Sequence, residues 1–140
     1  MSPSTVRLAT HDDIPALKIL DPWPSDDIWQ QKVTNTEVIV LDVGGDVVGV
    51  MRYALLWTTV PFLGLVFIQP EYRGHGYSSQ LLTYLKQHLR ERGFVALLSS
   101  SQTDEPEAQA WHVHMGFGSN GIIENIADDN VGELVYRLML

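Results

Sequence analysis

Apolar residues alternate with polar ones in some parts of the chain and recur every three or four positions in others. The helical pattern is strongest from about residue 76 to Arg92, where Leu81, Leu82, Leu85 and Leu89 share one face. Short β-branched runs such as residues 38–41 predict buried strands instead. The patterns predict strands near residues 5–9, 38–41, 47–57, 61–68, 94–98, 117–125 and 132–140, and helices near residues 11–20, 25–33, 76–92 and 104–115.

Turn residues and the order of the elements predict how the strands pair. Gly44 and Gly45 suit the positive-φ positions of a hairpin turn, so the three strands within residues 38–68 are expected to form an antiparallel meander. The strand, helix and strand that follow predict a parallel pair, because one crossover helix returns the chain to the same end of the sheet. An acidic loop, residues 128–130, joins the last two strands. The prediction is a mixed α/β domain (α+β in some schemes) whose central sheet is mostly antiparallel.

Composition narrows the class of protein. The 140 residues are expected to form one domain, residues 1–140, which is long enough to bury a core. A net charge of −8 argues against a surface for nucleic acids or anionic membranes. The absence of cysteine excludes disulfides and thiol chemistry. No signal-peptide pattern and no apolar run of about 18 residues occurs, so we expect a cytoplasmic protein.

The most informative motif is the run Arg73-Gly74-His75-Gly76-Tyr77-Ser78, which joins an apolar strand to the leucine-rich helix. Unpaired N–H groups and the positive end of the helix dipole meet at such a helix start. Glycine lets an anion approach the main chain closely. This stretch therefore predicts a binding site for a phosphorylated ligand.

Two motifs together resemble the GCN5-related N-acetyltransferase (GNAT) superfamily. Arg73-x-x-Gly76-x-Ser78 is similar to the family's phosphate motif, Gln/Arg-x-x-Gly-x-Gly/Ala, with Ser78 as one departure. The stretch from Ala108 to Met115-Gly116-Phe117 resembles the family's later helix, which ends in Gly-Phe. The resemblance covers nearly the whole chain. It implies the GNAT fold, in which the fourth and fifth strands are parallel and splay apart and about four helices flank the sheet.

The resemblance also implies acetyl-coenzyme A as cosubstrate. In the family, the backbone of the glycine loop holds the pyrophosphate, and the pantetheine arm pairs with the preceding strand like an added strand. By this likeness the cofactor-binding residues are Phe67, Ile68, Arg73, Gly74, His75, Gly76, Tyr77 and Ser78. Ser78 is expected either to donate to phosphate or to begin the helix without touching the ligand.

The catalytic residues are harder to assign, because both family positions carry substitutions. An Asn before the later helix and a Tyr on it are usual in the family, and the matching positions here hold Glu105 and His112. His112 is a candidate general acid, with a buried core histidine as the alternative. Glu105 is a weak candidate for the base, Glu124 is another, and a water chain is a third possibility. His112 and His114 point to opposite sides of a helix, so we expect no metal site.

The acceptor is expected to be a primary amine of a small molecule or peptide. By resemblance, its pocket is formed by the loop between the first two helices and by the central strands, which implicates Trp23, Tyr53 and Trp57. The last two share one predicted strand face, and they fit a place in the core equally well. The predicted activity is N-acetyl transfer by direct attack in a ternary complex, in a monomer or homodimer. The alternative is a coenzyme A-binding module of the same fold with weak catalysis.

Overall fold

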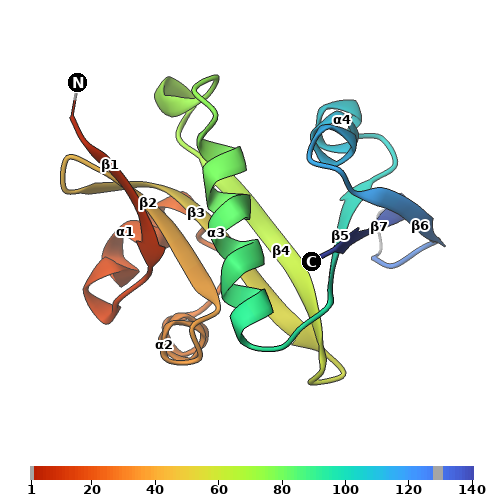
Figure 1. Cartoon of the computed structure of the whole chain (residues 1–140), viewed down its shortest axis with the longest axis horizontal. Coiled ribbons are helices and arrows are strands. Elements are labelled where there is room, and N and C mark those ends of the chain that lie inside the picture. Colours follow the sequence, from red (N-terminus) through yellow and green to blue (C-terminus); the bar gives the residue numbers. More distant parts are fainter. Residues whose placement is uncertain (1, 128–130) are drawn as a thin grey trace.

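The computed structural model describes residues 2–127 and 131–140. In this part of the chain one seven-stranded sheet has the order β1-β2-β3-β4-β5-β7-β6 (Figure 1). The predicted element order and the single parallel pair are confirmed. The predicted loop at residues 128–130 lies outside the described residues. The strands are β1 (Ser4–Leu8), β2 (Val38–Val43), β3 (Asp46–Leu56), β4 (Val60–Ile68), β5 (Ala96–Gln102), β6 (Gly118–Ile123) and β7 (Glu133–Met139); the helices are α1 (Ile14–Leu20), α2 (Asp26–Thr34), α3 (Tyr77–Glu91) and α4 (Pro106–His114), with short 3-10 turns at His11–Asp13 and Pro70–Tyr72.

Two apolar cores form, one on each face of the sheet. The leucines of α3 pack with Met51, Leu63 and Leu97 on one face. Trp29 of α2 and Leu17 of α1 pack with the valines of β2 and β3 on the other face. Figure 1 shows α3 and α4 on the same side of the sheet, with the gap between β4 and β5 lying between them. The leucine pattern of α3 therefore identified its buried face correctly.

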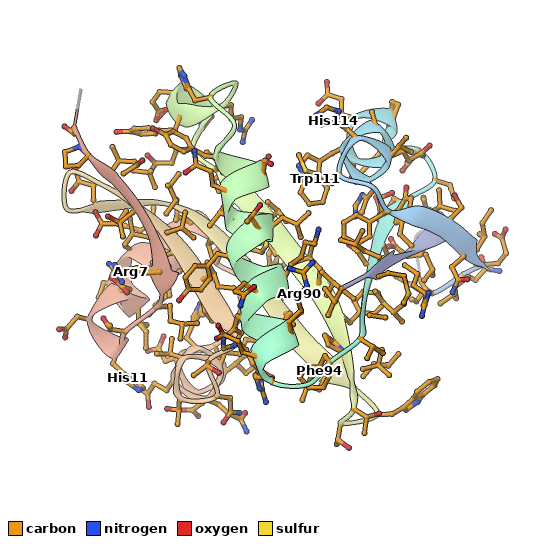
Figure 2. All side chains as sticks on the ribbon, in the orientation of Figure 1. Arg7, His11, Arg90, Phe94, Trp111 and His114 are labelled. Carbon is orange, nitrogen blue, oxygen red and sulfur yellow. The ribbon has the colours of Figure 1, made fainter. Side chains whose placement is uncertain are left out.

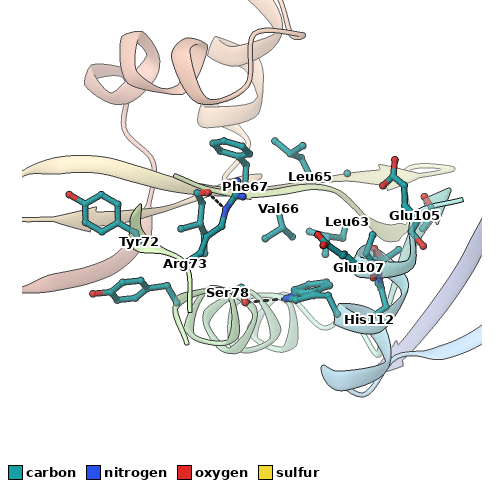
Figure 3. Close-up of a pocket in the computed structure, with 18 of the residues that line it drawn as sticks. Leu63, Leu65, Val66, Phe67, Tyr72, Arg73, Ser78, Glu105, Glu107 and His112 are labelled. Atoms are coloured by element: carbon teal, nitrogen blue, oxygen red, sulfur yellow. Dashed lines mark hydrogen bonds between the residues drawn. The ribbon is translucent and has the colours of Figure 1, made fainter. Parts of the chain in front are cut away.

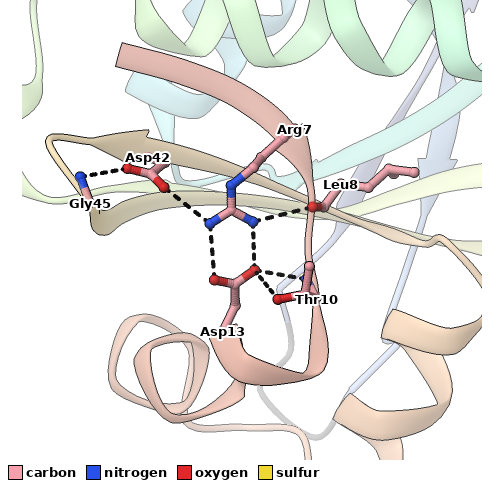
Figure 4. Close-up of polar contacts among 6 residues, drawn as sticks. All are labelled: Arg7, Leu8, Thr10, Asp13, Asp42 and Gly45. Atoms are coloured by element: carbon pink, nitrogen blue, oxygen red, sulfur yellow. Dashed lines mark hydrogen bonds and ion pairs between the residues drawn. The ribbon is translucent and has the colours of Figure 1, made fainter. Parts of the chain in front are cut away.

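The N-terminal edge of the sheet is held by a partly buried polar cluster (Figure 4). Arg7 of β1 pairs with Asp13 at 2.7 Å and with Asp42 at 3.1 Å. The main-chain N–H of Thr10 also donates to Asp13, at 2.7 Å. Burial alone would raise the pKa of Asp13, but these hydrogen bonds from Arg7 and Thr10 lower it below its ordinary value. The Asp13 carboxylate thus links the 3-10 turn at His11–Asp13 to strand β1 of the sheet.

The parallel pair separates after a very short contact. β4 pairs with β5 only at Phe62 with Leu98 and at Leu63 with Ser99. One residue later β4 carries a bulge, since Leu63 and Leu65 face consecutive residues of β3 and Gly64 is the extra residue. From Gly64 to Ile68, no pairing with β5 occurs in the described sheet. The predicted splay of these two strands is confirmed.

Most element boundaries differ from prediction by one or a few residues, and two of these differences matter for the site. β5 was expected to end at Leu98 with a polar exit, but it continues through Ser99 and Ser101 to Gln102. Serines can occupy inward strand positions here because the Ser99 hydroxyl bonds His112 and the Ser101 hydroxyl bonds Tyr136. β3 ends at Leu56, so Trp57 lies in the turn with a positive φ of 53°. The prediction that Trp57 shares a strand face with Tyr53 is wrong for that reason.

Candidate functional site

A cavity of about 550 Å³ opens where β4 and β5 diverge (Figure 3). The free edge of β4 forms one wall, and the start of α3 closes one end. The exit of β5 and the first turns of α4 form the opposite wall. The lining residues are Leu63 to Ile68, Tyr72 to Gly74, Gly76 to Ser78, Ser99 to Ser101, Glu105, Glu107, Ala108, Trp111 and His112.

The start of α3 has the geometry of an anion site. Gly74 and Gly76 both have a φ of +78°, in the left-handed region that glycine adopts without strain. A Cβ atom at either position would meet nothing within 4 Å, so the space above this main chain is open. No side chain caps the helix, whose N-cap is Gly76. The first-turn N–H groups are therefore available to a bound anion.

Two side chains hold this loop in place. Arg73 donates from Nε to the carbonyl of Ile68 at 2.8 Å and lies over the Phe67 ring, which ties the loop to the end of β4. Ser78 accepts a hydrogen bond from the indole N–H of Trp111 at 3.1 Å. Figure 2 shows Trp111 projecting from α4 toward α3. This hydrogen bond links α3 and α4, the two helices that border the cavity.

A buried serine–histidine pair lies on the opposite wall. Nδ1 of His112 is 2.7 Å from the carbonyl of Ala108, which can only accept, so this nitrogen carries a proton. In the neutral ring, Nε2 then accepts from the hydroxyl of Ser99, 2.7 Å away. Burial lowers the pKa of His112 below its ordinary value, although the hydrogen bond to Ala108 acts in the opposite direction. The pair is poised to take up a proton, and it donates one only after His112 has been protonated.

An aromatic stack fixes the orientation of this imidazole. The rings of His112 and Tyr136 are stacked, with centroids 4.1 Å apart and an angle of 3° between their planes. The hydroxyl of Tyr136 shares a hydrogen bond of 2.8 Å with Ser101, two residues along β5 from Ser99. Phe117 and Trp111 meet the same imidazole edge-on. His112 therefore has one rotamer and one direction in which to exchange a proton.

Two carboxylates line the cavity beside this pair. Glu105 precedes α4 and Glu107 lies in its first turn. Figure 3 shows Glu105 on the side of β4 where Leu65 lies, whereas Glu107 extends toward Leu63. Glu124, the other candidate base, is exposed and does not line the cavity. Acidic side chains in the described part of the site thus gather at its α4 end.

The comparisons with known proteins agree with this geometry. The model of the acetyltransferase (GNAT) family matches residues 7–117, which is more than half of the chain. The chain belongs to the GNAT acetyltransferase family. The prediction of family and fold is confirmed. No curated protein sequence matches the chain.

Solved structures of GNAT proteins superpose over nearly the full length. Ard1 from Thermoplasma volcanium has a TM-score of 0.83 at 19% identity, covering 98% of this chain and 97% of that one. Ribosomal-protein-alanine N-acetyltransferase from Brucella melitensis has a TM-score of 0.83 at 22% identity, covering 97% and 99%. The structure of yncA from Salmonella typhimurium with its cofactor acetyl-CoA has a TM-score of 0.81 at 17% identity, covering 99% and 95%. At these identities the likeness demonstrates a shared fold.

Most residues predicted to bind the cosubstrate of this GNAT chain line the cavity. The structure gathers Phe67, Ile68, Arg73, Gly74, Gly76, Tyr77 and Ser78 around it. His75 is exposed beside Tyr77 and is not among the lining residues. His112 and Glu105 also reach the cavity, on its α4 side. Residues 49 positions apart along the chain, Leu63 and His112, thus line one space.

The predicted acceptor residues are placed differently. Tyr53 is 1% exposed, beneath α3, where its hydroxyl accepts from Arg92 at 2.6 Å. Its side chain therefore occupies the core, as the alternative interpretation expected. Trp57 is 80% exposed in the β3–β4 turn and does not line the cavity. Trp23 is 88% exposed in the loop between α1 and α2 and does not line the cavity either.

Sequence reasoning missed Ser99, Glu107 and Tyr136. Ser99 lies just beyond the strand predicted at residues 94–98, and only the folded structure shows that it pairs with Leu63 and lines the cavity. Tyr136 follows the alternation of β7, which predicts burial without naming a partner. Glu107 had a signal, since it lies two residues beyond Glu105 in the first turn of the predicted helix. No cluster of three or more potential metal ligands occurs among the described residues.

No helix in the described ranges 2–127 and 131–140 is both long and apolar enough to cross a membrane.

Proposed function

We propose that this GNAT protein transfers an acetyl group from acetyl-CoA to a primary amine of a small molecule or peptide. The observation that carries the proposal is the cavity itself. It joins an uncapped helix N-terminus and a free strand edge at one end to the Ser99–His112 pair at the other. The acetyl-CoA-bound relative of the same fold supports this choice of cosubstrate.

The residues present fit coenzyme A along the whole cavity. The open main chain at Gly74 and Gly76 suits a pyrophosphate, since the N–H groups and the helix dipole act together. The unpaired edge of β4 from Leu65 to Ile68 offers strand hydrogen bonds to the amide-containing pantetheine arm. When bound, acetyl-CoA supplies the thioester whose acetyl group is transferred. A main-chain amide at the Gly64 bulge is the proposed donor to the thioester carbonyl.

The Ser99–His112 pair is the proposed route for the proton that the amine loses on attack. Ser99 Oγ accepts it while passing its own hydrogen to Nε2 of His112. Nδ1 stays bonded to Ala108, so the imidazole becomes positively charged within a buried site. Its lowered pKa then favours return of the proton through Ser99 to the departing sulfur. In this scheme His112 acts as the acid in the second half of the reaction.

Glu105 is the proposed base that first deprotonates an incoming ammonium. It lines the acceptor end of the cavity and carries the charge that attracts a cation. Because the chain contains no cysteine, no thiol is available for a covalent acyl-enzyme. Direct attack in a ternary complex is therefore the proposed kinetic order.

Coenzyme A binding and thiol release separate this proposal from the alternative, a binding module with weak catalysis. We expect acetyl-CoA turnover with a panel of primary amines, together with CoA binding measured by calorimetry. Gly76→Ala should weaken CoA binding at least about tenfold, because the added methyl group enters the anion cradle. Gly45→Ala is the matched control, since it introduces the same positive-φ strain in the β2–β3 turn. Tight CoA binding without turnover of any amine would favour the module.

A further inference from the structure

The side chain of Arg52 lies across the bulge of β4 on the face of the sheet that carries α1 and α2. Its Nε donates to Oδ2 of Asp21 at 2.6 Å. Asp21 is 2% exposed at the end of α1, so this pair ties the α1–α2 loop to β3. The contact between the two side chains is a single hydrogen bond from Nε to Oδ2. The other carboxylate oxygen of Asp21, Oδ1, has no hydrogen-bond partner among the described residues.

Gly64 determines where this guanidinium lies. A Cβ atom at Gly64 would be 3.0 Å from Nη1 of Arg52, so the missing side chain leaves room for the guanidinium against the main chain. Gly64 is also one of the residues that line the cavity. The guanidinium thus lies against a residue of the cavity wall, on the α1–α2 face of the sheet, although Arg52 itself is not among the lining residues.

The remaining donors of Arg52 are unused. Within residues 2–127 and 131–140, its Nη1 and Nη2 groups have no hydrogen-bond acceptor, although the side chain is only 19% exposed. A guanidinium presents its N–H groups in a planar fork that fits a carboxylate with two parallel hydrogen bonds. Partial burial strengthens such a contact relative to the same contact in water.

A second charge of opposite sign lies across the gap. Glu105 lines the same cavity on the α4 side and projects past β4 toward the side of Leu65 (Figure 3). Leu65 is the strand partner of Arg52 and shares its face of the sheet. A molecule with an ammonium and a carboxylate would therefore find a partner for each group.

We propose that Arg52 binds the carboxylate of the acceptor and that the acceptor is a free amino acid. The inference rests on the proposed transferase function and deepens it, because it names the substrate class. In this arrangement Asp21 holds the guanidinium in place through Nε, and the missing side chain of Gly64 leaves only main chain between the guanidinium and the cavity. Glu105 attracts the amine toward the thioester, and Arg52 holds the other end of the acceptor.

The first test compares each amino acid with its own amide and with its decarboxylated amine, using acetyl-CoA and thiol release. α-, β- and γ-amino acids are included, because the spacing between the two charges is the variable of interest. The best acid should exceed its amide roughly 10- to 100-fold in kcat/KM, the range given by hydrogen bonds to a charged group. Equal rates for acids and amides, or faster amides, would overturn the inference while leaving the transferase function intact. No turnover of any amine would count against the transferase function itself.

The second test uses variants of the arginine. Arg52→Gln should bring the acid-to-amide ratio close to one, mainly through a higher KM for the acid. Because this variant leaves Asp21 buried without a partner, the double variant Asp21→Asn/Arg52→Gln is measured beside it. Arg90→Gln, an exposed arginine on α3, is the control and should change neither rate (Figure 2). If the double variant folds and still prefers the acid by the original factor, Arg52 is only a structural tie and the inference fails.

Discussion

Two histidines, the partly buried His88 and the buried His112, occupy similar chemical environments in regions with different roles. Burial lowers the pKa of each below its ordinary value, and each lies within hydrogen-bond distance of a main-chain carbonyl. His88 is on the last turn of α3, where its Nε2 is 3.1 Å from the carbonyl of Thr36 and 3.3 Å from the hydroxyl of Tyr53. His112 directs its second nitrogen toward Ser99 at the wall of the cavity.

The difference teaches that a shifted pKa does not by itself identify a functional histidine. The region around His88 is a closed network in which Arg92 donates to Tyr53 and Lys32 donates to the Tyr53 carbonyl. Its polar groups contact one another, and none of these residues lines the cavity. In the region of His112, the partner hydroxyl faces an open cavity. The two histidines therefore differ in where the hydroxyl that they contact lies: that of Tyr53 is in the core, and that of Ser99 lines the cavity.

Exchanging each imidazole for a glutamine is the strongest test of this comparison. His112→Gln should lower kcat about 100-fold or more, within the range of about 10²–10⁴ attributed to positioned acid–base groups. His88→Gln should leave kcat nearly unchanged and lower the free energy of unfolding by about 1–2 kcal/mol, because one buried hydrogen bond is weakened. Steady-state kinetics and urea unfolding measure both. Equal losses of kcat in the two variants would remove the distinction.

The two serines of β5 give the next largest contrast. Ser99→Ala should lower kcat roughly tenfold or more, since the proton route between the cavity and His112 is interrupted. Ser101→Ala leaves the Tyr136 hydroxyl without a partner, so we expect a loss of about 1–3 kcal/mol in stability and little change in kcat. Ser99→Thr, which keeps the hydroxyl, should recover part of the rate. A Ser99→Ala enzyme with full activity would exclude the relay.

Acidification should separate the two histidines by pH dependence. A histidine with a lowered pKa in the folded state binds fewer protons than it does in the unfolded chain as pH falls below about 6.5. Its contribution to stability is therefore complete above that pH and is lost as pH falls through the folded pKa. Activity should fall over the same range because protonated His112 cannot accept from Ser99. In the His88→Gln variant, the free energy of unfolding should fall less at acidic pH than in the unchanged protein. The fall of the reaction rate at acidic pH should stay the same, because it depends on His112.

The smallest expected effect concerns the aromatic residues outside the cavity. Tyr53→Phe removes the hydroxyl that Arg92 and His88 contact, so it should cost about 1–2 kcal/mol of stability without changing the KM for acceptors. Trp57→Ser, at an exposed turn, should shift stability by less than about 0.5 kcal/mol. Thermal unfolding and acceptor kinetics measure both. If either variant shows a higher KM for the acceptor, the substituted residue takes part in acceptor binding and the prediction is wrong.

Local patterns predicted the elements well wherever propensity and burial agree. The leucines of α3, the glycines at its start and the β2–β3 turn are all short-range features, and the structure reproduces them. Errors arose where a polar residue is buried with a distant partner. Ser99 and Ser101 extend β5 because His112 and Tyr136, 13 and 35 residues away, satisfy their hydroxyls. No local pattern carries that information.

The sequence by itself determined the fold family and the anion-binding loop, because both depend on periodicity and on glycines at fixed spacing. Only the tertiary structure decided which side chains share the cavity. Tyr53 and His112 both have inward-facing positions, yet Tyr53 closes a core network, whereas His112 meets Ser99 of β5 at the wall of the cavity. The splay itself follows from strand pairing that stops at Leu63 and from the bulge at Gly64. Pairing and burial are long-range properties, so they become visible only when the chain is folded.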